Sequence, residues 1–176
     1  VVHTIEWTRH MFKWVNVFSF EPQEKIYYAL AGNITLNNCF NVKAFNVALG
    51  DQNAIIKIPK LNYFKSSSFG SFELERKKNN EYIGQKINYQ LTSEINMITI
   101  DSLYLDRVDL IKIDVEGMEE KVLKGSAKIL QKHKPIFIVE KIKSNKENLI
   151  SFFRHYNYHI LNFGLNFLFV YNEYPS

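Results

Sequence analysis

One stretch, residues 108–117, constrains the fold more than any other part of the sequence. An aliphatic run from Leu110 to Ile113 is followed by Asp114, Glu116 and Gly117, and a helical pattern begins directly afterwards. A short apolar run of this kind is typical of a buried strand in a parallel sheet. Since open α/β folds build their ligand sites at the carboxyl ends of strands, we expect Asp114 and Glu116 to lie at such a site.

Length and composition favour one globular domain, because 176 residues with 46% hydrophobic content are enough to bury a core. The formal net charge of +4 is spread over mixed charges, and the basic run at 76–78 predicts a solvated loop and no nucleic-acid site. The single Cys39 excludes an internal disulfide. No segment reaches the ~18 apolar residues that a membrane span needs, and no signal peptide is evident, so a cytoplasmic location is expected.

Helical and strand patterns alternate along most of the chain, which predicts an α/β fold. The predicted helices cover residues 4–14, about 26–34 with Pro22 in the first turn, 118–131 and about 149–153. The predicted strands cover residues 15–20, 42–49, 55–58, 87–91, 97–100, 109–114, 136–139, 158–163 and 166–171. The last two strands have no helix between them and are expected to pair antiparallel.

Residues 54–100 interrupt this alternation and predict a β-rich insertion within a single domain at 1–176. The loop at 65–72 is rich in serine, and its length makes a functional lid or insertion plausible. A plain solvated hairpin loop is the alternative interpretation.

Acids follow three of the predicted strands and are able to face one crevice. Glu21 stands where a mononucleotide-binding unit places its ribose-binding acid, because a carboxylate accepts both ribose hydroxyl protons. The alternative for Glu21 is a helix cap. Asp114 with Glu116 follows the second of these strands and Glu140 the third, while the 46–50 segment offers backbone groups and an apolar wall to an adenine ring.

Several motifs together resemble the FkbM-type methyltransferase family. They are Phe20-Glu21-Pro22, the segment 46–51, the serine loop 66–71, the segment 111–125 and the segment 134–140. The resemblance covers nearly the whole chain in the right order, and residues 112–117 are its most specific part. It implies a Rossmann-like class I sheet, mostly parallel with an antiparallel C-terminal strand pair, which uses S-adenosylmethionine for O-methylation of a sugar, glycan or metabolite hydroxyl.

The resemblance also implies roles for individual residues. The cofactor would be bound by Glu21, Pro22, Asn46, Ala48, Leu49 and Asp114. Asp114 and Glu116 are expected to be catalytic, as general base or for positioning of the acceptor, and Glu140 and Ser68 to contact the acceptor. Two alternatives remain open: Glu116 as a cap of the next helix, and Glu140 at the surface. The five histidines lack metal-ligand spacing, so no metal is expected.

The sequence departs from this family at its start. The family's Asp-x-Gly-Ala-Asn-x-Gly loop, which lets the backbone approach the methionine end of the cofactor, has no counterpart here. We therefore expect a chain that lacks the first strand and this loop, and the sequence leaves open whether this chain by itself binds the cofactor and is active. The rival hypotheses are a degenerate binding module and a dinucleotide-dependent oxidoreductase, and the sequence identifies neither the acceptor nor the oligomeric state.

Overall fold

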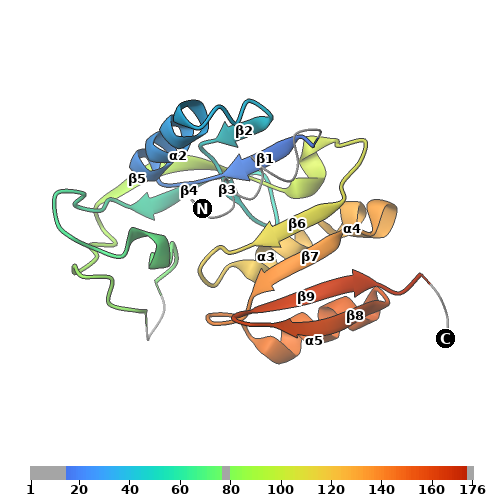
Figure 1. Cartoon of the computed structure of the whole chain (residues 1–176). Helices are drawn as coiled ribbons and strands as arrows, with labels where there is room; N and C mark the ends of the chain where they lie inside the picture. The colour runs from blue at the N-terminus through green and yellow to red at the C-terminus, as the bar shows by residue number, and fades with distance from the viewer. Residues whose placement is uncertain (1–14, 77–79, 174–176) are drawn as a thin grey trace. The chain divides into compact units, whose positions relative to one another are not determined.

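The computed structural model describes residues 15–76 and 80–173, which form an α/β fold divided into two compact units (Figure 1). The first unit comprises residues up to 48 with 55–69 and 83–96, and the second comprises 49–54, 70–82 and the chain from 97 onward. The elements are β1 (Val17–Phe20), α2 (Glu24–Leu36), β2 (Val42–Phe45), β3 (Ala48–Leu49), β4 (Ala54–Pro59), η1 (Phe69–Ser71), β5 (Thr92–Ile98), η2 (Ile100–Leu103), β6 (Leu110–Ile113), α3 (Glu119–Lys124), α4 (Ala127–His133), β7 (Ile136–Glu140), α5 (Lys146–His155), β8 (Tyr158–Phe163) and β9 (Asn166–Tyr171). The predicted helix at 4–14 and the basic residues Lys77 and Lys78 lie outside the described residues.

The first unit contains a parallel pair of strands with one helix beside it. β1 and β2 pair in register from Val17 opposite Val42, and α2 packs an apolar cluster against them. The buried members of this cluster are Leu30, Ile34, Cys39 and Val42. The predicted helix is confirmed, but Pro22 does not lie in its first turn: α2 begins at Glu24 after an extended Gln23.

The second unit is built on a four-stranded sheet in the order β6-β7-β9-β8. β6 and β7 are parallel, whereas β9 pairs antiparallel with both β7 and β8 (Figure 1). The predicted antiparallel pairing of the last two strands is therefore confirmed. A further three-stranded sheet has the order β3-β5-β4, so parallel and antiparallel pairs are both present in the chain.

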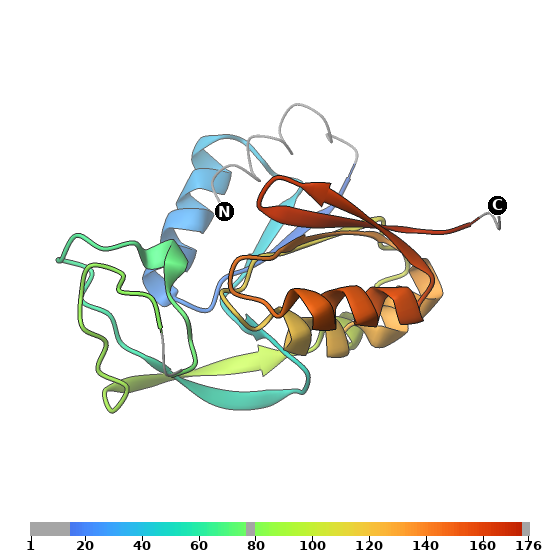
Figure 2. The same cartoon turned by 90° about the horizontal axis from the view of Figure 1, so that it is seen from below.

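One continuous core fixes the second unit. Helices α3, α4 and α5 lie on one face of its sheet (Figure 2), and the strands turn alternate residues toward them. Phe153 of α5 is fully buried and stacks on Phe169 of β9 with ring centroids 3.6 Å apart. The Phe137 ring of β7 packs edge-on against the Phe153 ring, with centroids 4.9 Å apart. Burial of these rings stabilises the sheet and so fixes the positions of the carboxyl ends of β6 and β7.

The predicted strand at 42–49 is two strands with a break at residues 46–47. The amide of Asn46 donates to the backbone oxygens of Glu21, at 2.8 Å, and Pro22, at 3.2 Å. Because its side chain is engaged with this neighbouring turn, the chain leaves β2 after Phe45 and resumes in β3, which pairs with β5. The apolar alternation alone did not reveal the break.

The predicted helix at 118–131 is also two helices, α3 and α4, which are separated by Gly125 and Ser126. A Cβ atom on Gly125 would lie 2.0 Å from the backbone oxygen of Gly50, so only glycine permits this close approach. The carbonyl of Gly125 accepts a hydrogen bond from the Asp101 amide, and the Asp101 carboxylate accepts from two amides of the first turn of α4. These tertiary contacts end one helix and begin the next.

The predicted strand at 87–91 is wrong, and that at 97–100 is displaced. The Asn88 side chain accepts from the amide of Gln90, and its carbonyl accepts from Leu91, so these residues form a turn. The strand β5 begins only at Thr92 and ends at Ile98, where the Thr99 hydroxyl caps η2.

Candidate functional site

The ends of β6 and β7 bring two acids together on one face of the sheet. Ile113 pairs with Val139, and both pack in the core, so the next residues, Asp114 and Glu140, lie on the face opposite the helices. The parallel register extended by one residue places these two acids side by side. This is the arrangement expected where adjacent parallel strands end in polar side chains.

A tight turn adds a third acid to this pair. Glu116 has a left-handed backbone with φ of 52°, and Gly117 follows with φ of 91°, which favours glycine. The buried Glu119 carboxylate accepts the Gly117 amide at 3.0 Å and so stabilises the turn. Carboxylate oxygens of Asp114, Glu116 and Glu140 all lie within 4.8 Å of one another; we call these three residues the acid group.

The members of the acid group differ in their partners. Asp114 pairs with Lys112 at 2.5 Å and Glu116 with Lys143 at 2.6 Å, whereas no cation among the described residues pairs with Glu140. Desolvation by burial, followed by the charges of Asp114, Glu116 and Glu119, raises the pKa of Glu140 to about 7 against a weaker opposing effect of Lys112. Glu140 is therefore the member of the group that can exchange a proton near neutral pH.

Glu116 does not cap the next helix. The N-cap residue of α3 is Met118, which makes no side-chain cap hydrogen bond, and the Glu116 carboxylate points instead to Lys143. Burial raises the pKa of Glu116, and the hydrogen bond and charge of Lys143 oppose that rise.

Lys143, in the loop after β7, is a site residue that the sequence patterns did not identify. Burial would lower the pKa of its ammonium, but hydrogen bonds to Glu116 and Glu81 outweigh burial and raise it. Its partners are distant in the sequence, and its own neighbourhood carries no recognisable motif. Glu119, at the start of α3, is a further residue that the sequence patterns did not identify: it is 1% exposed, and its carboxylate fixes the turn that carries Glu116.

In the first unit, Glu21 lies at the end of β1 as predicted and is 8% exposed. Its Oε1 accepts the amide of Gln23 at 2.8 Å, while its second oxygen has no partner among the described residues. Burial raises the pKa of Glu21, and the hydrogen bond from Gln23 opposes the rise. Glu21 thus supports the start of α2 with one of its two carboxylate oxygens.

The buried Gln23 is a second residue that the sequence patterns missed. Its side-chain amide donates to the Phe69 carbonyl at 3.0 Å, and its oxygen accepts from the Tyr63 hydroxyl at 3.4 Å. The Tyr63 and Phe69 rings stack with centroids 4.9 Å apart. These contacts tie the turn after β1 to the 63–69 segment within the same unit.

The remaining predicted contact residues fall in different surroundings. Asn46 and Pro22 are joined by the hydrogen bonds described above, Ala48 is buried, and Leu49 packs at the edge of the second unit's core. Ser68 belongs to the first unit, where its amide donates to the Ile83 carbonyl at 2.7 Å, whereas Glu140 belongs to the second.

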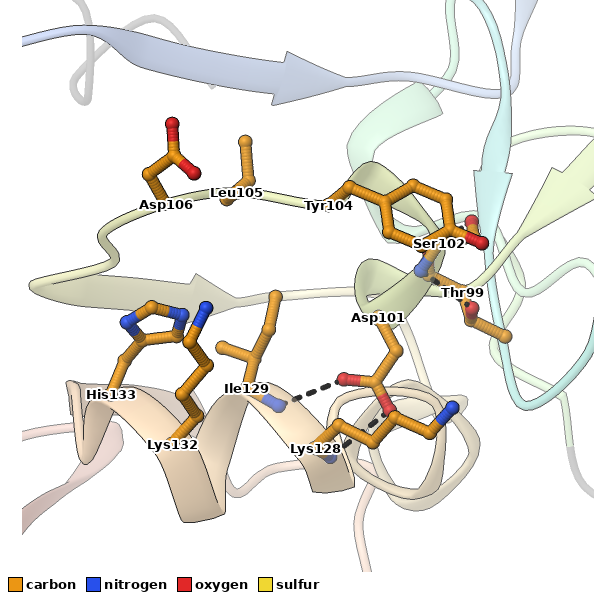
Figure 3. A pocket seen from close by; sticks show the side chains of 10 residues that line it. All are labelled: Thr99, Asp101, Ser102, Tyr104, Leu105, Asp106, Lys128, Ile129, Lys132 and His133. Atoms are coloured by element: carbon orange, nitrogen blue, oxygen red, sulfur yellow. Dashed lines mark hydrogen bonds between the residues drawn. The ribbon is translucent and has the colours of Figure 1, made fainter.

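A surface pocket of about 350 Å³ lies elsewhere in the second unit (Figure 3). It is lined by η2, by residues 104–106 and by α4. The carboxylate of Asp101 lies in this lining and accepts a hydrogen bond from the Lys128 amide in the first turn of α4. The lining contains no member of the acid group and no residue of the segments that follow β6 and β7 directly. We therefore place a candidate site at the acid group in the second unit and a separate one at the β1 turn in the first unit, and none at this pocket.

Comparison with known proteins decides which family this geometry belongs to. The family model for the methyltransferase FkbM domain matches residues 2–160. The chain belongs to the FkbM methyltransferase family. The resemblance inferred from the sequence motifs is thereby confirmed, and methyltransferase activity is the activity that this FkbM family membership suggests.

The fold agrees with a solved member of the FkbM family. A crystal structure of methyltransferase FkbM from Methylobacillus flagellatus KT is similar with a TM-score of 0.59 and 15% identity. The similarity covers 89% of this chain and 36% of that chain, so this FkbM chain spans about a third of the other's length. At this identity the likeness shows the fold alone. No curated protein matches the sequence.

Two further observations concern a metal site and membrane-spanning helices in this FkbM chain. The acid group offers hard oxygen donors, but lysines already balance Asp114 and Glu116, and we assign no metal to it. None of the helices in residues 15–76 and 80–173 has the length and apolar character required to cross a bilayer.

Proposed function

We propose that this chain is an S-adenosylmethionine-dependent methyltransferase domain with a Rossmann-like sheet, which methylates a hydroxyl of a sugar, glycan or metabolite. The observation that carries the proposal is the acid group at the carboxyl ends of two adjacent parallel strands in a member of the FkbM family. Such strand ends are where open α/β sheets bind their ligands.

The cofactor assignment draws on the turn after β1. A buried carboxylate with one oxygen free among the described residues suits two ribose hydroxyls, and Glu21 has this arrangement. Ala48 and Leu49 offer apolar surface for an adenine ring, and Asn46 holds the Glu21–Pro22 turn in place. When bound, S-adenosylmethionine supplies an activated methyl group on a sulfonium.

The protein's own residues would align the acceptor hydroxyl and take up its proton. Glu140, with a pKa near neutrality and no cation partner among the described residues, is suited to accept that proton. Asp114, paired with Lys112, is suited to orient the hydroxyl by accepting a hydrogen bond from it. The Glu116 carboxylate lies within 4.8 Å of Asp114 and is close enough to assist in this positioning. Base and orienting acid would then occupy neighbouring strand ends, which favours an in-line approach.

Calorimetric titration of the purified protein with S-adenosylhomocysteine and, separately, with NAD tests the proposal. We expect saturable binding of S-adenosylhomocysteine and none of NAD. Binding of NAD alone would identify a dinucleotide-dependent oxidoreductase, and binding of neither compound would support a degenerate module; either result contradicts the proposed function.

A further inference from the structure

A single largely buried lysine, Lys143, joins three parts of the second unit. Its Nζ atom lies 2.6 Å from Oε2 of Glu116, 2.8 Å from Oε2 of Glu81 and 2.8 Å from the carbonyl oxygen of Ser71. Its side chain is 14% exposed. An ammonium group has three donors, and these three partners use all of them, so the side chain is fixed in one orientation.

The burial of this ammonium argues for a specific role. A charge removed from water is costly unless it is paired and hydrogen-bonded, so lysines are normally left in solvent. The Glu116 side chain is 17% exposed, which makes this pair a mostly buried one, while Glu81 at 53% is open to solvent. Lys143 therefore balances the charge of one member of the acid group at a position that is largely shielded from solvent.

The same lysine fastens a second stretch of chain, residues 70–76 with 80–82, which we call the clamped segment. Phe72 and Glu73 of this segment are buried, and the Glu73 carboxylate accepts the Glu81 amide at 3.2 Å. Lys121 of α3 forms an ion pair with Glu75, but both side chains are more than 40% exposed, and such pairs contribute little. Lys143 thus gives the clamped segment a more buried polar link to the strand ends than Lys121 does.

We propose that Lys143 is a positioning residue of the methyl-transfer site, whose ammonium holds Glu116 and the clamped segment together so that they form one preorganised surface with the acid group. The proposal rests on the proposed function for the meaning of that site, but the clamp itself is a property of the fold. Preorganised side chains lose less freedom when a substrate binds, which is why sites place such residues behind the reacting groups.

The test compares Lys143→Met and Lys143→Arg with the wild type and with Lys146→Met, which removes an exposed lysine in α5. Hydrogen exchange is measured at the amides of residues 72–76 and 81–82, together with the carboxyl NMR titration of Glu116. For Lys143→Met we expect about 10-fold faster exchange in the clamped segment and a higher pKa of Glu116, because a buried partner is lost. Lys143→Arg retains the charge, so its exchange rate and Glu116 pKa should lie close to those of the wild type. Lys146→Met should change neither the exchange rate nor the pKa of Glu116.

Unchanged exchange and an unchanged Glu116 titration in Lys143→Met would overturn the proposal, as would failure of Lys143→Arg to restore either. If Lys143→Met does not fold, Glu81→Gln removes one link at its exposed end and should speed exchange at residues 81–82 by about 3-fold or more; no change would likewise overturn the clamp. A parallel titration of the wild type with S-adenosylhomocysteine keeps the two claims apart, since absent binding would contradict the proposed function while the exchange data decide on the clamp.

Discussion

The turn after β1 and the turn after β6 both follow a parallel strand with an acid, yet they use it differently. At β1, the buried Glu21 is held by the backbone amide of Gln23, and the apolar cluster of its unit is small. At β6, the acid group is balanced by Lys112 and Lys143 and lies over the continuous core of the second unit. The first arrangement suits a fixed acceptor for ligand hydroxyls, and the second suits proton exchange.

The position of an acid at a strand end does not by itself set its pKa, because the neighbouring groups decide it. Hydrogen bonding to a backbone amide stabilises the charged form, whereas neighbouring carboxylates disfavour it. Burial raises the pKa of both Glu21 and Glu140; the amide of Gln23 opposes the rise at Glu21, whereas three neighbouring acids add to it at Glu140. The following predictions separate the two regions, beginning with the largest expected effect.

Substitution in the acid group should reduce methyl transfer far more than cofactor binding. Glu140→Gln removes the proposed proton acceptor, so methyl transfer should fall by about 100- to 10,000-fold, and Asp114→Asn should also reduce it far more than cofactor binding. Transfer of a labelled methyl group to a panel of sugars and glycans measures the rate, with Glu147→Gln on the exposed face of α5 as control. Unchanged turnover in either variant would reject the role given to that residue.

Removal of a ring from the core beneath β6 should cause the largest loss of stability. Phe153→Ala deletes a fully buried side chain that contacts Phe137 and Phe169, so the free energy of unfolding should fall by about 3–5 kcal/mol. Urea unfolding measures the change. Phe163→Ala, at a side chain that is 60% exposed, should alter it by less than about 0.5 kcal/mol. Equal effects of the two variants would contradict the assignment of the core.

In the β1 turn, the hydrogen bond matters more for stability than the charge. Glu21→Ala leaves the Gln23 amide without its acceptor in a buried position, which should cost about 1–3 kcal/mol. Glu21→Gln retains a side-chain oxygen and should cost clearly less. Urea unfolding of the two variants at neutral pH makes the comparison, and a Gln variant as unstable as the Ala variant would show that the charge is what holds the turn.

At the end of β7, the negative charge of Glu140 should lower the stability of the folded protein. The pKa of Glu140 is raised to about 7 in the folded protein, so folding is penalised as pH rises from the unfolded value of 4.5 through 7. Glu140→Gln should therefore stabilise the protein at pH 8 by up to about 1 kcal/mol after allowance for solvent screening, and by nothing at pH 4. Thermal unfolding at both pH values tests this. A stabilisation of the same size at both would contradict the raised pKa.

The sequence predicted the order of most elements because apolar periodicity records which face of a strand or helix is buried. It also placed Glu21, Asp114 and Glu116 at strand ends. It did not predict the breaks at Asn46 and Gly125, because each depends on a contact with a residue remote in the chain. Periodicity reports the burial of a segment but not its partner.

The same limit explains what was missed in the site. Lys143 acquires its role from Ser71, Glu81 and Glu116, which lie in other segments, and no local pattern around Lys143 indicates them. The sequence did predict that Asp114 and Glu140 follow strands and are able to face one crevice. Their side-by-side arrangement follows from the register of β6 and β7, which becomes known only when the strands are aligned.

The comparison between the two turns is tested most directly by the affinity of one variant for S-adenosylhomocysteine. Glu21→Gln removes the proposed charged acceptor of the ribose hydroxyls, so calorimetry should show binding weakened by about 10-fold or more relative to the wild type. Glu94→Gln, at an exposed position of β5, should bind as the wild type does. Undiminished affinity in Glu21→Gln would contradict the assignment of the β1 turn to the cofactor.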